Sequence, residues 1–518
     1  MTLARTFMEP LTDRGFPVSR EQWAVAFSIS AMVAAIVVPV AAHVNVWVGM
    51  SAAIICFAPL RVIAVRMPMM LRGAQQRRPV LSTAWLVLVL VALVQMTRLS
   101  AFMVDPSRLW GSTVPDPAAA NHQCLAAYVH AADLCRRGER NVYDEQWYPA
   151  FTTPLFAEPH GMSSPIDGLG PWILDPYQYP PPFLLLPRAA LAITNSFGHI
   201  RTAWFVIQSL CLVIGGLLLA RWIGGREGLV AALLLPAILA SIPTMLNFQF
   251  GQFHVMAVML ALAAMVAFDR RRFAAGGALL SFAILSKIFP GLLLVTLAAQ
   301  RRWREIGWTL GLGVVFVLLA LLLLGSDPFV AFTSYQLPRI LSGEAFSFIR
   351  RADVPVFLVS RDFSIYGIVA KLRLLGMTGV GLATAHALTW AYTVLLVWLA
   401  WRARLEPPNR RALVVVWLAL LSLAALRSPL APSAYVTAPV LWLLALLAAE
   451  VRSRYWMAMA LGVAWTLIMG PPPLPDKVDL VVTMLGQVLV VATSVWALLH
   501  FPTRTSEKST RATVPMPA

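Results

Sequence analysis

Apolar residues in this sequence recur in long runs, and these runs constrain the fold more than any motif does. Each run holds roughly 17–22 residues, the length that crosses the hydrocarbon core of a bilayer as a helix. Hydrophobic residues make up 59% of the 518 positions and charged residues 13%, with a mean hydropathy of +0.73. Soluble domains are about 45–50% apolar and about 25% charged. The sequence therefore predicts an all-α polytopic membrane protein and excludes a soluble globular enzyme.

The apolar runs predict about twelve membrane-spanning helices. We expect them near residues 22–42, 46–65, 80–99, 201–222, 227–244, 252–268, 306–325, 380–401, 411–427, 434–450, 455–470 and 479–500. The first run follows about twenty mixed polar residues and lacks a small-residue cleavage pattern. We therefore interpret it as a signal anchor rather than as a cleaved signal peptide.

Basic residues set the expected orientation of these helices. The chain has 41 Lys and Arg against 24 Asp and Glu, which gives a net charge of +17. The basic residues lie in short loops between alternate runs, as the positive-inside rule requires when both termini are cytoplasmic. In a soluble protein this charge would favour nucleic-acid binding, but here it indicates topology. The prediction is a multi-pass protein of the plasma (inner) membrane, whose partner is the lipid bilayer and not nucleic acid.

Two apolar stretches are expected not to cross the membrane. Residues 274–300 start and end on the cytoplasmic side and are interrupted by Lys287 and Pro290, which predicts a re-entrant hairpin of two half-helices. Lys287 then lies at membrane depth, where an ionisable group is a functional candidate. The run over residues 180–194 is short and rich in proline. We expect an interfacial helix there, on the outer side.

Two long segments, about 100–200 and 326–378, are expected on the extracytoplasmic side, and they hold most of the acidic residues. Loops of this length are uncommon without structure or function, so we look for the site there. A carboxylate beside Arg or Lys at a membrane face suits transfer from a phosphate-linked lipid donor. The carboxylate deprotonates the attacking hydroxyl, and the cation binds the departing phosphate. His254, at the outer start of a span, either faces a lipid-phosphate cleft or has a capping or packing role.

Cys124 and Cys135 share one polar segment, and two alternatives are open for them. They can form a disulfide if the segment is extracytoplasmic. In one continuous helix they would lie on one face about 16 Å apart, which is too far for a bond. The sequence has no Walker loop, no Rossmann glycine pattern and no metal-spaced cluster of His and Cys. We therefore do not expect ATP-driven transport within this chain.

Short motifs follow one another between about residues 100 and 435. They are Ala131-Ala132 with Gly138 and Asn141-Val142-Tyr143-Asp144; Tyr179-Pro180-Pro181-Pro182; Gly251-Gln252-Phe253-His254; Gly276-Gly277; Ser286-Lys287-Ile288-Phe289-Pro290; Arg301-Arg302-Trp303-Arg304; Asp362-Phe363-Ser364 before Leu372-Arg373-Leu374-Leu375-Gly376; and Ser428-Pro429-Leu430. In their order and spacing the sequence resembles glycosyltransferase family 87, the polyprenyl-phosphate-sugar-dependent mannosyl- and arabinofuranosyltransferases of bacterial envelopes, which have the GT-C fold.

The resemblance implies a GT-C-like bundle with its cleft on the extracytoplasmic side. It implies a polyprenyl-phosphate sugar as donor, a glycan or lipid of the envelope as acceptor, and no metal or other cofactor. The domain limits expected from it are 1–79 for a cytoplasmic segment with two additional helices, 80–500 for the transferase domain and 501–518 for a disordered cytoplasmic tail. The residues expected to bind substrate are Lys287, His254, Gln252, Arg339, Arg350, Arg361 and Tyr179.

Two departures from the family pattern concern the catalytic residues. The family's catalytic aspartate usually lies a few residues before a Tyr and an Ala-rich helix, and counting back from Tyr128 gives Cys124. A thiol is a poor proton acceptor, because it is mostly protonated at neutral pH. A histidine usually follows the Ser-Pro segment, but residues 428–435 contain none. An error of register, a relocated base and a loss of activity are three open explanations.

The candidates for a relocated base lie just upstream of Cys124. Asp116 ranks first, followed by Asp105 and by His122, whose imidazole titrates near neutral pH. The sequence therefore predicts an enzyme that performs inverting glycosyl transfer at the outer membrane face. The alternatives are a transporter or flippase of lipid-linked intermediates and a catalytically inactive family member that serves in assembly.

Overall fold

The computed structural model describes residues 20–44, 47–56, 79–114, 120–148, 166–170, 172, 175–345, 356–404, 409–450 and 474–500. Throughout these ranges the regular structure is helical and no strand occurs. Two isolated bridges pair Asp167 with Ser196 and Asp362 with Pro432. The prediction of an all-α protein is confirmed for this part of the chain.

Six helices in the described ranges are long and apolar enough to cross a membrane. They are α2 (Arg20–Val44), α4 (Pro79–Val104), α9 (Phe197–Ile223), α16 (Trp303–Leu324), α21 (Leu382–Arg402) and α25 (Asp476–His500). A helix pair over residues 225–249, bent by 63°, raises the number to seven if it counts as one span. The structure therefore does not bear out the expected number of about twelve spans.

The other expected spans are shorter helices or lie outside the described residues. Three of them correspond to α13 (His254–Asp269), α22 (Arg410–Ala425) and α23 (Ser433–Glu450). The 16 residues of α13 extend about 24 Å, less than the hydrocarbon core of about 30 Å. The run expected at 46–65 begins as a helix over Trp47–Cys56. Its remainder and the run at 455–470 are not among the described residues.

The span expected at residues 227–244 is broken, which corrects the prediction of a single helix. The structure has three helices there, α10 (Gly225–Leu233), α11 (Leu235–Ala240) and α12 (Ile242–Gln249). Pro236 and Pro243 lie in the first turns of α11 and α12. Proline lacks an N–H group, and its ring clashes with the preceding turn, so an apolar run cannot continue through it as one straight helix.

A second break, at Lys287, turns the chain back on itself. The segments around it are α14 (Phe273–Ser286), η5 (Phe289–Gly291) and α15 (Leu292–Ala299). α14 and α16 lie parallel, because Gly277 meets Trp308 and the Phe282 and Phe316 rings lie 5.6 Å apart. A Cβ on Gly277 would stand 2.8 Å from the backbone of Trp308, so this approach needs glycine. Since both helices start at the same end, α15 returns the chain, which is the path that a re-entrant segment requires.

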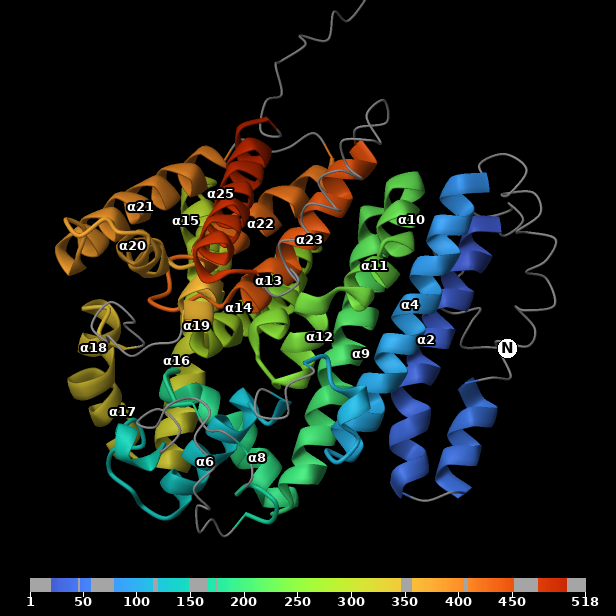
Figure 1. Ribbon diagram of the computed structural model, residues 1–518, viewed down its shortest axis with the longest axis horizontal. Helices are drawn as coiled ribbons and strands as arrows, with labels where there is room; N and C mark the ends of the chain where they lie inside the picture. The colour runs from blue at the N-terminus through green and yellow to red at the C-terminus, as the bar shows by residue number, and fades with distance from the viewer. Residues whose placement is uncertain are drawn as a thin grey trace, which may run out of the picture.

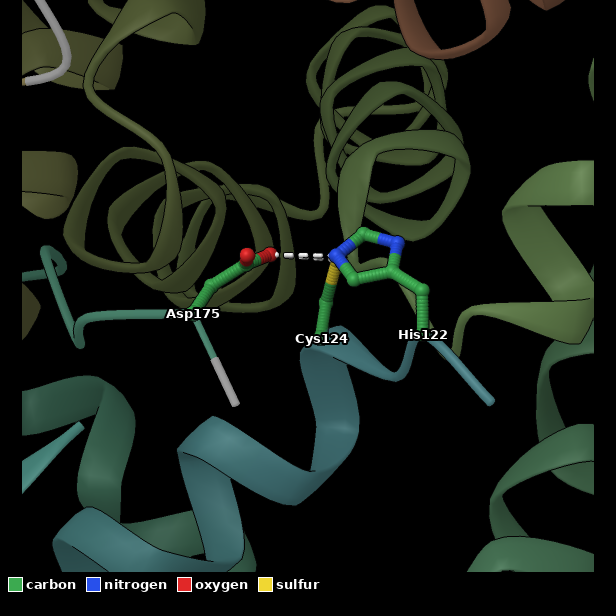
Figure 2. A group of neighbouring side chains, drawn as sticks. All are labelled: His122, Cys124 and Asp175. Atoms are coloured by element: carbon green, nitrogen blue, oxygen red, sulfur yellow. Dashed lines mark hydrogen bonds and ion pairs between the residues drawn. The ribbon is translucent and has the colours of Figure 1, made fainter. Parts of the chain in front are cut away.

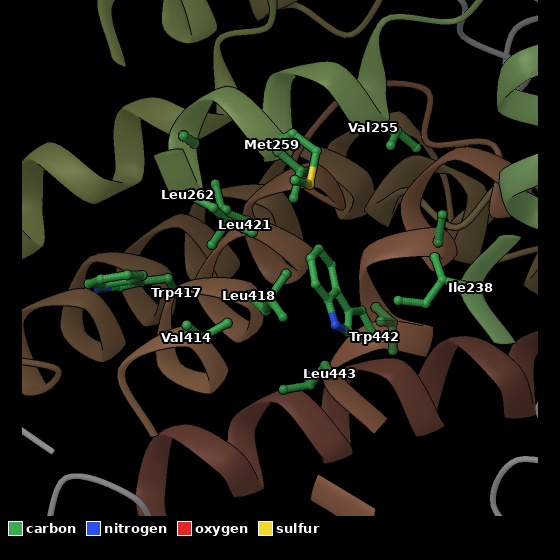
Figure 3. Close-up of a cluster of buried hydrophobic side chains, with 14 of the residues drawn as sticks. Ile238, Val255, Met259, Leu262, Val414, Trp417, Leu418, Leu421, Trp442 and Leu443 are labelled. Carbon is green, nitrogen blue, oxygen red and sulfur yellow. The ribbon is translucent and has the colours of Figure 1, made fainter. Parts of the chain in front are cut away.

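The core lies where α13, α22, α23 and α11 meet (Figure 3). Met259 of α13 points toward Leu418 and Leu421 of α22, and Trp442 of α23 fills the space beside them. Every residue of α22 from Val414 to Ala425 is buried. A helix that is apolar on all sides belongs in the interior of a bundle. α22 is therefore an interior helix, and the spanning helices α9, α21 and α25 pack against it.

The described turns among those expected on the cytoplasmic side lie together at one end of the bundle, at the top of Figure 1. Trp222 at the end of α9 donates from Nε1 to Asp269 over 2.9 Å and accepts a hydrogen bond of 2.9 Å from Arg410. Arg411 pairs with Glu227 over 3.3 Å. These bonds join the ends of α9 and α13 to the starts of α10 and α22.

The opposite end carries α6 (Cys124–Arg136), α8 (Leu185–Ile193) and α17 (Asp327–Ala331), at the bottom of Figure 1. The Pro-rich run forms only η4 (Pro181–Leu184) and α8, which are too short to span a bilayer. Cys124 and Cys135 stand at the two ends of α6 and both are free, so the disulfide alternative is wrong. The remaining elements are η2 (Leu109–Gly111), η3 (Glu145–Trp147), η6 (Phe332–Gln336), α18 (Leu337–Leu341), α19 (Val356–Arg361) and α20 (Ile365–Leu374).

Candidate active site

The first turn of α6 is fixed against the connection between α12 and α13. Gln123 donates from its amide to the carbonyl of Gln249 over 2.5 Å, and the backbone N–H of Leu125 donates to the carbonyl of Phe250 over 3.2 Å. Gly251 has φ +62°, and a Cβ there would stand 2.6 Å from the side chain of Leu125. Glycine is therefore needed both for the turn and for the approach of α6. This contact brings Cys124 next to the residue that follows Gly251.

A row of polar contacts runs from Cys124 to Lys287. Gln252 donates from Nε2 to Cys124 Sγ over 3.7 Å and accepts at Oε1 from the Tyr128 hydroxyl over 2.6 Å. The Tyr128 and Tyr179 hydroxyl oxygens are 3.3 Å apart, and Lys287 Nζ donates to the Tyr179 hydroxyl over 2.5 Å. Four chain segments thus contribute to one continuous polar site.

Lys287 occupies the break between α14 and η5, where its backbone is extended (φ −147°, ψ 112°). Its ammonium group also lies 3.9 Å from the centre of the Tyr179 ring. Among the described residues no carboxylate forms an ion pair with it. His254, the first residue of α13, stacks on Phe289 at 4.5 Å. A partly buried cation without a counter-ion is suited to bind an anionic ligand.

At the other end of the row, His122, Cys124 and Asp175 point toward one another (Figure 2). His122 Nε2 and Asp175 Oδ2 are 2.7 Å apart, and the Cys124 thiol donates to the same oxygen over 3.7 Å. The Tyr435 hydroxyl lies 3.3 Å from Cys124 Sγ. The side chains of His122 and Asp175 remain 22% and 28% exposed, so a ligand can reach them.

The charges of this group follow from its contacts. Burial lowers the pKa of His122, but the carboxylate of Asp175 raises it by more, so the net shift is upward. Burial raises the pKa of Asp175, but the charge of His122 and the hydrogen bonds from His122 and Cys124 together lower it by more, and the pKa falls below its usual value. Burial, and then the charge of Asp175, raise the pKa of Cys124. The group therefore holds a carboxylate beside a thiol at neutral pH.

The structure brings some of the expected site residues together and leaves others apart. Tyr179, Gln252 and Lys287 share the row of contacts, His254 lies beside it, and His122 belongs to the carboxylate group.

Asp105 is engaged in the turn that ends α4, where it accepts from Ser107 and pairs with Arg108 over 3.1 Å. Arg339 pairs with Glu145 and donates to Tyr335, and Arg361 pairs with Asp479 over 3.2 Å. Asp116, the candidate base ranked first, and Arg350 lie outside the described residues.

Sequence reasoning missed Asp175 and Tyr435 as site residues. Asp175 lies four positions before Tyr179 in a segment already singled out, and that proximity was a signal that could have found it. Tyr435 ends the segment in which the family usually has a histidine. Asn247 donates to the carbonyl of Ala434 over 2.9 Å and so holds this segment against α12. The two places where the sequence departs from the family pattern, Cys124 and the segment that ends at Tyr435, are therefore in contact.

Residues 177–429 match the model of glycosyltransferase family 87. The match includes Tyr179, Gln252 and Lys287, whereas the carboxylate group and Tyr435 lie outside its limits. No curated protein and no solved structure matches the chain.

Proposed function

Because the chain belongs to glycosyltransferase family 87 and is a membrane glycosyltransferase, we propose that it uses a polyprenyl-phosphate sugar as donor. The sugar is of the mannose or arabinofuranose type, and the acceptor is a glycan or lipid of the envelope. The reaction takes place on the extracytoplasmic face of the plasma membrane, with both termini in the cytoplasm. Residues 80–500 form the transferase unit in this proposal, 1–79 are an N-terminal addition and 501–518 are a tail.

The observation that carries the proposal is the position of Asp175 beside Cys124. Cys124 stands where the family resemblance leads one to expect the catalytic aspartate, and the Asp175 carboxylate lies 3.7 Å from its sulfur. Asp175 thus supplies, from another segment, the carboxylate that residue 124 lacks. No described residue donates a hydrogen bond to its Oδ1, which leaves that oxygen for an acceptor hydroxyl.

In the proposed reaction Asp175 accepts the proton of the acceptor hydroxyl while the hydroxyl oxygen attacks the anomeric carbon of the donor sugar. The bond from that carbon to the phosphate oxygen breaks, and the polyprenyl phosphate leaves with the electron pair. A single displacement of this kind inverts the anomeric configuration. His122, 2.7 Å from Asp175 Oδ2, holds the carboxylate in position.

Lys287 binds the phosphate of the donor in this proposal. Its ammonium group has a phenol hydroxyl and a ring as neighbours but no carboxylate partner among the described residues, so a phosphate would supply the missing charge. Negative charge on the phosphate grows as the glycosidic bond breaks, and a fixed cation stabilises it most at that point. His254 and Tyr179 line the same position.

The experiment uses purified full-length protein in nanodiscs with radiolabelled polyprenyl-phosphate mannose or arabinose and envelope lipid extract. We expect transfer from one donor, and we expect Asp175→Asn to lower its rate about 10²–10⁴-fold, the range for loss of a general base. Asp105→Asn is the matched control, because it alters an outer carboxylate that already serves a turn.

Two outcomes would overturn parts of this proposal. If Asp175→Asn transfers at the wild-type rate, the base lies elsewhere, and Asp116 is the next candidate. If wild-type protein transfers no sugar from either donor, an inactive family member or a flippase of lipid-linked intermediates accounts better for the fold.

A further inference from the structure

We propose that His122, Cys124 and Asp175 form a binding site for a divalent transition-metal ion of the zinc class. Their ligand atoms, one nitrogen, one sulfur and one oxygen, all lie within 4.8 Å of one another (Figure 2). This site goes beyond the transfer reaction proposed above and does not depend on it. Spacing along the sequence did not reveal it, because Asp175 lies 51 positions from Cys124.

The kinds of ligand atom select the ion. Thiolate and imidazole favour zinc, cobalt and similar ions, whereas magnesium and calcium prefer sites made of oxygen atoms. Three protein ligands leave one tetrahedral position for water or another molecule. The partly exposed His122 and Asp175 keep that position accessible from outside the bundle.

The distances need only a small adjustment to hold such an ion. Tetrahedral zinc bonds of about 2.0–2.1 Å to nitrogen and oxygen and about 2.3 Å to sulfur place the ligand atoms roughly 3.3–3.6 Å apart. In the structure the sulfur lies 3.7 Å and the imidazole nitrogen 2.7 Å from Asp175 Oδ2. A rotation of the carboxylate opens the shorter contact, and the His122 nitrogen and the Cys124 sulfur, which lie within 4.8 Å of each other, must also approach by up to about 1 Å.

Neighbouring side chains suit a metal-bound thiolate. Gln252 donates its amide to the sulfur over 3.7 Å, and the Tyr435 hydroxyl lies 3.3 Å from it. Such outer contacts orient ligands and stabilise their charge. The Phe250 ring meets His122 edge-on at 4.7 Å and limits its rotation. The ligands are thus held by contacts that exist without the ion.

The test uses cobalt(II) as the probe, added to metal-free full-length protein in nanodiscs. We expect one equivalent of cobalt to bind with a thiolate-to-cobalt charge-transfer absorption band, and we expect zinc to remove the band by displacement. Cys124→Ser should abolish the band, and His122→Ala should weaken cobalt binding at least tenfold. Cys135→Ser is the matched control and should keep the band, because Cys135 stands at the far end of the same helix.

The proposal is wrong if wild-type protein gives no thiolate band, or if the band persists in Cys124→Ser. In either case His122 and Asp175 form a simple ion pair beside an uninvolved thiol. The absorption spectrum of wild-type protein with cobalt is enough to overturn the proposal, so the test remains valid even if a variant does not fold. Since absorption is measured and not sugar transfer, failure here is distinct from failure of the proposed transferase function.

Discussion

Two regions of this protein each combine a carboxylate with a lysine, and their bonding differs. Both oxygens of Asp362 are occupied, since Oδ1 accepts from the N–H groups of Ser364 and Ala431 over 2.9 and 3.0 Å and Oδ2 accepts from the Ser364 hydroxyl over 2.9 Å. Asp175 uses one oxygen, for His122 and a thiol. A carboxylate whose acceptor positions are filled by the backbone stabilises a fold, whereas one with a free oxygen can act on a ligand.

The lysines differ in the same sense. Lys371 is fully buried in α20, donates to Gln487 over 3.4 Å, and is attracted by the charges of Asp362 and Asp479 and repelled by that of Arg361. Lys287 is partly buried and has Tyr179 as its hydrogen-bond partner. The first lysine has its counter-charges within the protein, and the second is arranged for a charge that arrives with a ligand. We therefore propose a structural role for Asp362 and Lys371 and a role in ligand binding and chemistry for Asp175 and Lys287.

Replacing each of the two lysines with methionine, one at a time, should give the largest difference in transfer rate between the two regions. Lys287→Met should reduce transfer about 10²–10³-fold, the loss typical when one preorganised group that stabilises developing charge is removed. Lys371→Met should leave transfer by the folded fraction unchanged. Initial rates per folded protein, with folding assessed by size-exclusion chromatography, make the comparison. Equal losses in both variants would contradict the distinction between the regions.

Zinc should bind at the region of Asp175, and not at that of Asp362, and should inhibit transfer. An ion bound to Asp175 withdraws negative charge from the carboxylate and makes it a weaker base, so transfer should fall about 100-fold at a zinc concentration 100 times its dissociation constant. Transfer rates measured before and after addition of a chelator test this, and the chelator should restore the rate. A chelator that abolishes transfer by untreated protein would show instead that the reaction requires the ion.

The variant Asp362→Asn tests whether Asp362 stabilises the fold without taking part in transfer. Asparagine has one acceptor oxygen where the carboxylate has two, so a buried donor loses its partner at a cost of about 1–3 kcal/mol in the free energy of unfolding. Thermal unfolding in detergent should show the loss, while the transfer rate of the folded protein stays the same. A stable variant without transfer activity would move Asp362 into the active site.

The sequence predicted the parts of this structure that depend on local pattern. Long apolar runs predicted helices such as α9 and α16, and Lys287 with Pro290 predicted the break after α14. Two prolines within one run were not enough to predict the break into α10, α11 and α12, because proline in the first turn of a helix is compatible with continued helix nearby. Counting spans by hydropathy also gave α13 a full crossing that its 16 residues do not provide.

Only the site residues that belong to the sequence motifs could be predicted. Tyr179, Gln252 and Lys287 belong to motifs of the family resemblance, and they are in mutual contact or share a partner. Asp175 was among many outer carboxylates, and periodicity carries no information about which loop residue meets the start of α6. Asp362 also belongs to a motif of the resemblance, but the backbone N–H groups bonded to it show that it is part of the fold.

If Asp175 supplies the carboxylate that position 124 lacks, an aspartate placed at position 124 should restore transfer when Asp175 is removed. Asp175→Asn is combined with Cys124→Asp, and the initial transfer rate of the double variant is compared with that of Asp175→Asn alone and of wild-type protein. We expect the double variant to transfer sugar at least tenfold faster than Asp175→Asn. The side chains at positions 124 and 175 lie 3.7 Å apart, so a carboxylate at either position can reach the same acceptor hydroxyl. A folded double variant as inactive as Asp175→Asn would contradict it.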